Sequence, residues 1–590
     1  MEVRAAANPK SCSDLRAQKR GRPTWSRDLE FILVTVGYAV GLSNIWRFPY
    51  LCYHSGGGAF LIPYLIMVLL CGIPLLFLEF AIGQYTRLGP VHAFTKICPL
   101  LKGVGLGTVF ISFLFPTYYA IILSWALYYL FSSFRAVLPW TSCNNTWNVT
   151  GKCSSGFLAG NSTHLQSASQ QFFDHRLLEK TNSIEELGGI RWELFGCLFA
   201  VWVIIYFCIF KGVKSTGKVV YFTAVFPYFI LIALLINNAQ LPGAKDGVLY
   251  FVTPVWNKLF DVQVWVYAAA QVFNSLGISF GSMVSLASYN RFSNNILRDA
   301  LIVSVCNSFT SILAGFVIFS GIGYMAYTHN LPVDRIATDG PGLVFVVYPE
   351  VLSTMPGYQI WTPLFFFMLV CLGLDSEFSN VEVTVTFIKD QYGARLLPYV
   401  KREELLALAV CVVCFIFGIP HITKGGIYVF QLMDHYLAVV SLVFLAFFEV
   451  VAVCWFFGVP RISVMVKRML GKAPNLYFRL CWLLFCPLLV FGILISSIVK
   501  YTPVQYEKYK YPWWAECVGW IISLVSIVWI PLGIIQEIIS NKGSLIQRIK
   551  TAMIPTIDLD IKEQILSDPM GEEMSPHDMT GNEATAMFVP

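Results

Sequence analysis

Glycines and polar residues interrupt an apolar stretch near the N-terminus, GYAVGLSNIWRFPY (residues 37–50). Gly37 and Gly41 remove side-chain bulk, Asn44 is polar, and Arg47 carries a full charge. Backbone N–H and C=O groups that lack helical hydrogen bonds are tolerated within a membrane only where they line a cavity or bind a ligand. Carbonyl and amide oxygens at such a break suit Na⁺, and an exposed helix N-terminus suits a carboxylate. The stretch therefore predicts a binding site inside a membrane, with close helix packing at the glycines as the alternative.

Two further apolar segments carry the same kind of chemistry. NSLGISFGS (residues 274–282) again combines glycines with small polar side chains. LGLDS (residues 372–376) places Asp375 deep in an apolar run. A carboxylate is costly in lipid, so a bound cation is its natural partner, with a hydrogen bond to a neighbouring helix as the alternative. Repetition of the glycine-interrupted pattern favours a binding site over packing alone.

The composition indicates that these residues lie in a polytopic membrane protein. Of 590 residues, 56% are hydrophobic and only 13% are charged, whereas soluble domains average roughly 25% charged residues. Mean hydropathy is +0.64. Apolar runs of about 20 residues, each long enough to cross a bilayer, recur along the chain. We expect twelve membrane-spanning helices, at residues 29–52, 58–85, 104–134, 192–210, 218–240, 262–287, 297–327, 359–388, 404–420, 426–456, 477–500 and 514–540.

Basic residues predict the side of the membrane on which each loop lies. The N-terminal tail and every second loop are rich in lysine and arginine, which places them in the cytoplasm. We therefore expect cytoplasmic tails at 1–28 and 541–590, a membrane domain at 29–540, and an extracellular loop at 135–191. The net charge of +6 reflects these loops and does not indicate nucleic-acid binding.

The extracellular loop carries a cysteine pair and three glycosylation sequons. Asn144, Asn148 and Asn161 each begin an Asn-X-Ser/Thr triplet. Cys143 and Cys153 flank the first two sequons, on the side of the membrane where a disulfide persists. We expect these two cysteines to form a disulfide and the three asparagines to carry glycans.

The positions of the two glycine-interrupted spans predict the architecture. They are the first and the sixth, which indicates two five-helix halves of inverted topology, followed by helices 11 and 12. The expected fold class is all-α, with helices 1 and 6 broken. The eight histidines show no metal-ligand spacing and there is no nucleophile–base arrangement, so we do not expect an enzyme.

GYAVGLSNIWRFPY, followed by SGGGAFLIPY, resembles the signature of the neurotransmitter:sodium symporters, solute carrier family 6, in its amino-acid/GABA-type branch. The resemblance runs from about Arg22 to the end of the twelfth span and includes KGVKSTGK (211–218), PGLVFVVYP (341–349) and LGLDS (372–376). It implies a plasma-membrane symporter that couples a small zwitterionic substrate to Na⁺ and Cl⁻ by alternating access. Whether the protein forms a homo-oligomer is left open.

The resemblance implies two sodium sites and one chloride site, all made by neutral oxygens and donors apart from one carboxylate. The first sodium site would use the Ala39 carbonyl with Asn44, Ser275 and Asn307. The second would use the carbonyls of Gly37, Val40 and Leu372 with Asp375 and Ser376. Chloride would be held by Tyr85, Gln271, Ser275 and Ser311. Chloride-independent relatives supply a carboxylate at this site, so Ser311 favours chloride coupling.

Two ion pairs are implied as gates. Arg47 with Asp434 resembles the outer pair, and Arg22 with Asp390 resembles the inner pair. Closing such a pair loses hydration but gains Coulomb energy, so it can be nearly balanced and act as a gate. The alternative for Arg47 is a side chain that extends to the outer interface.

The expected substrate site comprises Gly41, Tyr119, Asn274 and Gly277. Monoamine carriers have an aspartate where this chain has Gly41, so an amino acid or amino-acid-like zwitterion is favoured. Tyr119 matches the phenol that contacts substrate, and Gly277 is expected to enlarge the floor of the pocket.

Three residues depart from the family pattern. Asn274 replaces the usual phenylalanine that covers the substrate, Ser43 replaces a glycine, and Glu377 replaces a glutamine. Asn274 weakens apolar closure over the substrate. These departures leave one alternative function, an orphan member with little transport that acts as a channel-like or receptor-like membrane protein.

Overall fold

Long apolar helices make up most of this structure, a computed structural model that describes residues 24–25, 27–154, 166–335, 342–400, 403–499, 501, 503–506 and 509–557. Nine helical runs in these ranges are long and apolar enough to cross a membrane: Gly58–Thr86, Pro99–Ser133, Trp192–Ile209, Ser215–Ala239, Ile296–His329, Tyr358–Gly393, Glu404–Ile422, Gly426–Leu470 and Leu476–Val499. Two bent pairs also qualify, Asp28–Ala39 with Ser43–His54 (45°) and Trp513–Ile527 with Trp529–Ser540 (40°).

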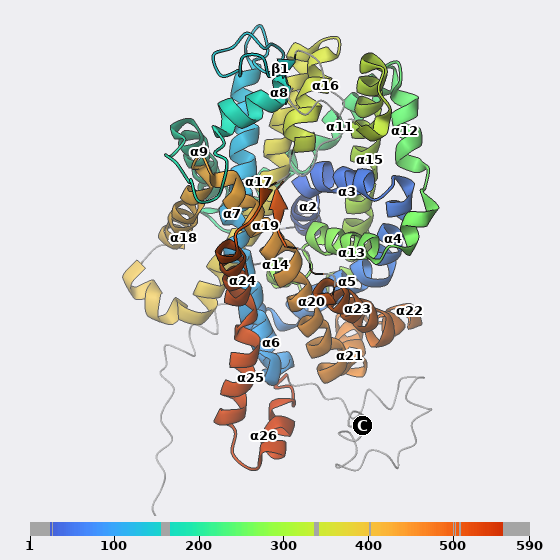
Figure 1. The fold of residues 1–590 in the computed structure, drawn as a ribbon. Helices are drawn as coiled ribbons and strands as arrows, with labels where there is room; N and C mark the ends of the chain where they lie inside the picture. The colour runs from blue at the N-terminus through green and yellow to red at the C-terminus, as the bar shows by residue number, and fades with distance from the viewer. Residues whose placement is uncertain are drawn as a thin grey trace, which may run out of the picture.

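A broken helix completes the twelve expected spans. It consists of α13 (Val262–Leu276) and α14 (Ser282–Ala287), which occupy the predicted sixth span. The first span is the other helix predicted to break, and it bends between Ala39 and Ser43. The predicted all-α fold with broken helices 1 and 6 is therefore confirmed (Figure 1).

The spans are built from the following elements. The first five contain α2 (Asp28–Ala39), η1 (Ser43–Arg47), α3 (Phe48–His54), α4 (Gly58–Met67), η2 (Val68–Gly72), α5 (Ile73–Thr86), η3 (Pro99–Leu101), α7 (Gly103–Ser133), α9 (Trp192–Ile209), α10 (Val213–Thr223) and α11 (Phe226–Ala239). After the sixth come α15 (Ile296–His329), α17 (Tyr358–Val400), α18 (Glu403–Gly418), η8 (Ile419–Ile422), α19 (Gly426–His435), η9 (Tyr436–Ser441), α20 (Leu442–Val450), η10 (Val451–Gly458), α21 (Val459–Leu470), α22 (Leu476–Leu480), η11 (Cys481–Phe485), α23 (Cys486–Val499), α24 (Trp513–Ile527) and α25 (Trp529–Ser540).

Shorter elements connect the spans. They are α6 (Pro90–Ile97), β1 (Cys153–Ser154), β2 (Gln166–Ser167), α8 (Ala168–Gln171), η4 (Phe172–Leu178), α12 (Ala244–Val252), η5 (Trp256–Phe260), η6 (Val333–Arg335), η7 (Leu343–Val347), α16 (Tyr348–Thr354), β3 (Gln505–Tyr506), β4 (Tyr509–Lys510) and α26 (Leu545–Ala552). Strand β1 pairs parallel with β2, and β3 pairs antiparallel with β4.

Burial separates inner helices from outer ones. In the span that contains α17, 89% of the most apolar window is buried inside the protein, against 28% in the span formed by α22, η11 and α23. Outer helices expose large apolar side chains such as Phe199, Phe229 and Phe491. Apolar side chains on all faces of a helix require either a protein core or lipid around it. The inner helices therefore form the scaffold that positions the site, and the outer helices face the bilayer.

The two ends of the bundle differ. Figure 1 places β1, α8 and α16 at one end and α26 at the opposite end. The disulfide Cys143–Cys153 lies in the loop that carries β1, which confirms the predicted pairing. The loop before α16 packs against the bundle, as the distance of 5.7 Å between the Phe345 and Trp125 rings shows. At the opposite end, the Thr556 backbone N–H donates to the Lys96 carbonyl (2.9 Å) and attaches the segment after α26 to the bundle.

The predicted glycosylation sites differ in their surroundings. Asn144 is exposed. The Asn148 amide nitrogen donates to Gln171 Oε1 (3.1 Å) and is half-buried. Asn161 lies outside the described residues. Glycosylation at all three positions stays a prediction.

Candidate ion and substrate site

The break in helix 1 exposes backbone groups that side chains then satisfy. Helix α2 ends at Ala39, and Val40 leaves the helical region with φ −89° and ψ 79°. The Gly41 N–H donates to Asn44 Oδ1 (3.1 Å), and the Leu42 N–H donates to the Tyr119 hydroxyl (3.1 Å). Backbone groups buried away from water require such partners. These hydrogen bonds therefore hold the open turn in a defined conformation inside the bundle.

The break in helix 6 depends on left-handed backbone conformations. Gly277, Ser279 and Gly281 have φ values of +66°, +66° and +74°. The Ser279 N–H donates to Glu79 Oε1 (2.7 Å), and the Phe280 carbonyl accepts from Ser112 Oγ (2.5 Å). A left-handed conformation is costly for a residue with a Cβ, so neighbouring helices hold Ser279 in place.

The structure corrects the prediction for Gly277. An ideal Cβ at this position would lie 2.1 Å from Cε1 of the Tyr38 ring. The tyrosine ring fills the space that the missing side chain leaves, and Gly277 does not line the central cavity. The prediction that Gly277 enlarges the floor of the pocket is therefore wrong; this glycine permits the turn and the close approach of Tyr38.

The predicted side chains of the first sodium site come together from helices 1, 6 and 7. Asn44 Nδ2 donates to Asn307 Oδ1 (2.7 Å), and Asn307 Nδ2 donates to Ser275 Oγ (3.0 Å). All three residues are buried, and Ala39 is the last residue of α2 beside them. The cluster offers amide, hydroxyl and carbonyl oxygens, which fit a monovalent cation.

The predicted residues of the second sodium site meet between helices 1 and 8. An ideal Cβ at Gly37 would lie 2.6 Å from Asp375 Oδ2, so only glycine allows the carboxylate to approach this backbone. Ser376 Oγ donates to the Tyr38 carbonyl (3.2 Å). Asp375 is 2% exposed, and no ion pair within the described ranges neutralises it. A buried carboxylate without a counter-charge fits a cation.

Thr223 belongs to this group, although the sequence reasoning did not include it. Its hydroxyl donates to Asp375 Oδ1 (2.5 Å) from helix α10. The threonine lies in an apolar run without a motif, so no sequence signal pointed to it. It fixes the orientation of the carboxylate.

The structure also corrects one residue of the predicted chloride site. The Tyr85 hydroxyl accepts from Arg468 Nη1 (3.0 Å), near the end of α5. The Tyr64 hydroxyl, by contrast, lies 3.5 Å from Ser311 Oγ. The two tyrosines are 21 positions apart in one span, or roughly 30 Å along a helix. The structure therefore separates Tyr85 from the other predicted chloride residues, and Tyr64 is the tyrosine that lies beside Ser311.

The other predicted chloride residues lie with Tyr64. Ser311 Oγ accepts from Asn44 Nδ2 (2.8 Å), and Gln271 Nε2 donates to the Ser43 carbonyl (3.2 Å). Gln271 Oε1 is buried and lacks a hydrogen-bond partner among the described residues. Hydroxyl and amide donors without an acidic side chain fit a small anion.

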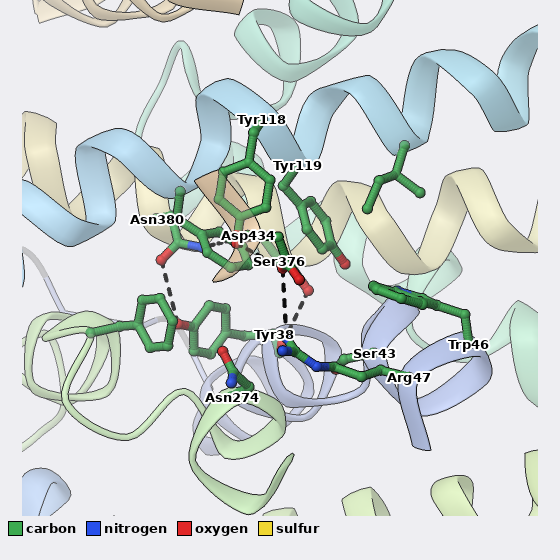
Figure 2. Close-up of a pocket in the computed structure, with 13 residues that line it drawn as sticks. Tyr38, Ser43, Trp46, Arg47, Tyr118, Tyr119, Asn274, Ser376, Asn380 and Asp434 are labelled. Atoms are coloured by element: carbon green, nitrogen blue, oxygen red, sulfur yellow. Dashed lines mark hydrogen bonds and ion pairs between the residues drawn. The ribbon is translucent and has the colours of Figure 1, made fainter. Parts of the chain in front are cut away.

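Figure 2 shows a small central cavity between the broken helices and helices 3, 8 and 10. Its lining includes Tyr38, Tyr119, Asn274, Ser376 and Asp434. Arg47 Nη1 and Asp434 Oδ1 are 3.6 Å apart, and the Tyr118 hydroxyl donates to the same oxygen (3.4 Å). The two residues of the predicted outer ion pair are thus brought together in the lining of the cavity, and their role as a gate stays a prediction.

Asn274 ties helix 6 to helix 10. Its Nδ2 donates to the carbonyls of Ala270 and Ala438, each at 2.9 Å. Ala438 lies in the π-helical segment η9. The side chain that departs from the family pattern therefore makes a specific contact between two helices.

Of the predicted inner ion pair, Arg22 with Asp390, only Asp390 is described, because Arg22 lies outside the described residues. Asp390 Oδ2 accepts from the Gly89 N–H (3.0 Å).

Comparison with known proteins identifies relatives along nearly the whole chain. The profile of the "Sodium:neurotransmitter symporter family" matches residues 22–541. The "Sodium- and chloride-dependent GABA transporter ine" of Drosophila melanogaster is 45% identical over 553 residues, which are 92% of this chain and 58% of the fly protein. "Sodium- and chloride-dependent GABA transporter 2" of Rattus norvegicus is 44% identical, covering 92% of this chain and 91% of the rat protein.

A creatine carrier and a solved structure extend the comparison. The human "Sodium- and chloride-dependent creatine transporter 1" is 43% identical and covers 89% of this chain and 85% of its own length. The crystal structure of MhsT in complex with L-phenylalanine has a TM-score of 0.67 at 24% identity, covering 81% of this chain and 100% of MhsT. At this identity, the structural likeness establishes the fold.

Proposed function

Since the chain belongs to the sodium:neurotransmitter symporter family, we propose that it is a sodium- and chloride-coupled symporter of a small zwitterion across the plasma membrane. The observation that carries this proposal is the break in helix 1, where open backbone lies beside Tyr119 and Ser376. An open backbone at this depth requires a functional reason. We place both termini in the cytoplasm; the position of α26 at the opposite end of the bundle from β1 in Figure 1 supports this for the C-terminal side.

The substrate that fits is an amino acid or an amino-acid-like zwitterion. An ideal Cβ at Gly41 would lie 2.5 Å from Ser376 Oγ and 3.1 Å from the Tyr119 hydroxyl. This space cannot hold the aspartate that would pair with the ammonium group of a monoamine. A substrate carboxylate would instead lie at the break, near Tyr119 and the first sodium ion. GABA and creatine, named for the relatives, are small zwitterions of this class.

Two bound sodium ions would hold the broken helix together. The first would be coordinated by Asn44, Ser275 and Asn307 with the Ala39 carbonyl. The second would be coordinated by Asp375 and Ser376 with the carbonyls of Gly37, Val40 and Leu372. Each ion would contact helix 1 and a scaffold helix, so the free energy of sodium binding would stabilise the conformer that accepts substrate.

Chloride would be bound by Tyr64, Gln271, Ser275 and Ser311. Its negative charge would offset the charge of the sodium ions in a region of low dielectric constant, where uncompensated charge is costly. Substrate binding would then allow Arg47 and Asp434 to close the outer side. Release would follow on the cytoplasmic side.

Uptake of radiolabelled GABA, taurine, betaine, creatine and proline by expressing cells tests the proposal. We expect saturable uptake of at least one substrate, which disappears when choline replaces Na⁺ and falls when gluconate replaces Cl⁻. The variant Ser311→Glu should relieve the chloride requirement because it supplies a fixed negative charge.

The same experiment distinguishes the alternative function. Surface-expressed protein that takes up none of these compounds, yet shows sodium currents, would favour a channel-like protein over a symporter. Uptake that is independent of Na⁺ would contradict both sodium sites.

A further inference from the structure

Two carboxyl groups face the break in helix 6 without belonging to the ion or substrate residues described above. Glu79, on α5, is 1% exposed, and Glu449, on α20, is 3% exposed. Glu79 Oε1 accepts from the Ser279 N–H (2.7 Å). Glu449 interacts with Glu79 and with the Ser279 side chain. Two acids from different helices therefore meet at one residue of the unwound segment.

Among the described residues, the groups that face this pair are neutral or acidic. Glu79 faces Tyr38 of α2 and Glu449 of α20, and Glu449 also faces Cys454 of η10. Neither glutamate takes part in an ion pair within the described parts of the chain. The Oε2 atoms of both glutamates have no hydrogen-bond partner among the described residues.

A third polar group points to a missing ligand at the same place. Ser279 is 1% exposed, and its hydroxyl oxygen also lacks a hydrogen-bond partner of ordinary geometry within the described residues. Buried polar groups are nearly always satisfied in folded proteins. The two carboxylate oxygens without a partner, next to this serine, therefore point to a ligand that the two glutamates share.

The chemistry of the cluster favours a proton over a metal cation. Two ionised carboxylates in a buried site repel each other, so one of them is held neutral, as in carboxylate pairs that share a proton. A metal ion would need several more oxygen ligands, and no group of three or more acidic, histidine or cysteine side chains suited to a metal occurs in the described ranges. A proton needs only the two carboxylates.

We propose that Glu79 and Glu449 form a proton-binding site that makes the break in helix 6 sensitive to pH. The Ser279 N–H stabilises Glu79 as the ionised partner, because hydrogen bonds to a charged acceptor are the stronger ones. Glu449 then carries the proton. When opening of the helix break admits water, the O–H bond of Glu449 breaks and the proton passes to water. Low pH favours the closed conformer, and high pH favours opening.

Infrared spectroscopy of the purified, sodium-loaded protein tests the site itself, independently of transport. All variants are made in a Glu350→Gln background, because burial raises the pKa of this α16 carboxyl to about 7 and its titration would overlap with that of the pair. We expect Glu449→Gln to lose one carbonyl band of a protonated carboxylic acid. Glu79→Gln removes the repulsion but leaves Glu449 buried, so the band should remain. An unchanged spectrum in Glu449→Gln would overturn the proposal, and displacement of the band by added K⁺ would indicate a metal-cation site instead.

The consequence for transport rests on the proposed function and needs a second measurement. We expect the initial rate of uptake in the Glu350→Gln background to increase from pH 6 to pH 8, and Glu449→Gln to flatten that profile. A pH profile unaltered by Glu449→Gln would overturn the coupling to helix 6. Absence of uptake in every variant would contradict the proposed function, and the infrared result would still decide the proton site.

Discussion

Asp375 is a buried carboxylate without an ion-pair partner among the described residues, and we expect a sodium ion to neutralise it. Asp375→Asn keeps the shape of the side chain but removes the charge, so sodium would lose its one anionic ligand. We expect uptake to fall by more than about tenfold, which corresponds to about 1.4 kcal/mol of lost binding free energy. Uptake measured against sodium concentration, with surface biotinylation as the expression control, checks this result. Normal sodium dependence of uptake in Asp375→Asn would contradict the assignment of Asp375 to the second sodium site.

Tyr64 and Tyr85 form a matched pair for testing the chloride site. Tyr64→Phe removes a hydroxyl near Ser311, and a hydrogen bond to a charged partner is worth about 1.5–3 kcal/mol. We expect the chloride concentration for half-maximal uptake to increase roughly 10- to 100-fold. Tyr85→Phe, at the Arg468 end of the span, should leave that concentration unchanged. A higher chloride requirement in Tyr85→Phe, with an unchanged one in Tyr64→Phe, would place Tyr85 in the chloride site instead.

The resemblance to the symporter family correctly grouped polar residues that lie far apart in the sequence. Asn44, Ser275 and Asn307 are polar residues in apolar runs, and the structure brings them into contact. It failed where several residues of one type share a span, because composition does not report depth in the membrane. Tyr85 was chosen over Tyr64 for this reason. Thr223 was missed because threonine is common in apolar helices.

At the scale of elements, the breaks in helices 1 and 6 were predictable from glycine and small polar residues. The close contacts at those breaks were not, because they depend on which distant side chain packs there. Tyr38 against Gly277 is the example: its ring comes from helix 1 and fills the space beside a turn in helix 6. The π-helical segments were not predicted either, since they differ from α-helix in an i→i+5 hydrogen bond that residue composition does not report.

Gly277→Ala tests the role of this turn. The new methyl group would occupy the Tyr38 ring and would require a left-handed residue with a Cβ. We expect a loss of more than about 2 kcal/mol in stability, measured as a lower Tm of the purified protein. Gly196→Ala in α9, where no atom lies within 4 Å of an ideal Cβ, is the matched control and should leave Tm unchanged or slightly higher. An equal Tm for both variants would show that the turn adapts.

At the scale of the whole molecule, Arg47 and Asp434 pair beside the cavity, and the elements at the end of the bundle that carries β1 and α16 pack down on it. Glu350, on α16, takes part in that packing through Ser167 and Ser169 of the neighbouring loop. Burial raises the pKa of Glu350 from 4.5 to about 7, although the two serine hydroxyls lower it in part. The end of the bundle that carries α16 therefore contains a carboxyl whose pKa lies near physiological pH.

This raised pKa fixes the sign of a pH effect. Between about pH 4.5 and pH 7, the packed form of Glu350 binds more protons than the unpacked form. Stability therefore decreases as pH rises through that interval and levels off above it, by at most about 3 kcal/mol. Tm measured at pH 5, 6, 7 and 8 should decrease in the parent protein and change less in Glu350→Gln. A Tm that rises with pH in the parent but not in Glu350→Gln would contradict this assignment.

The amide of Asn274 holds helices 6 and 10 together through one neutral bond to Ala438, where the cavity is covered. Such a bond contributes about 1 kcal/mol, or roughly a fivefold change in an equilibrium constant. This contribution is too small to hold the protein permanently in the conformer with the covered cavity, yet it is large enough to increase the population of that conformer. Because Asn274 also lines the central cavity, its substitution should change turnover through this helix contact as well as through any contact with the substrate.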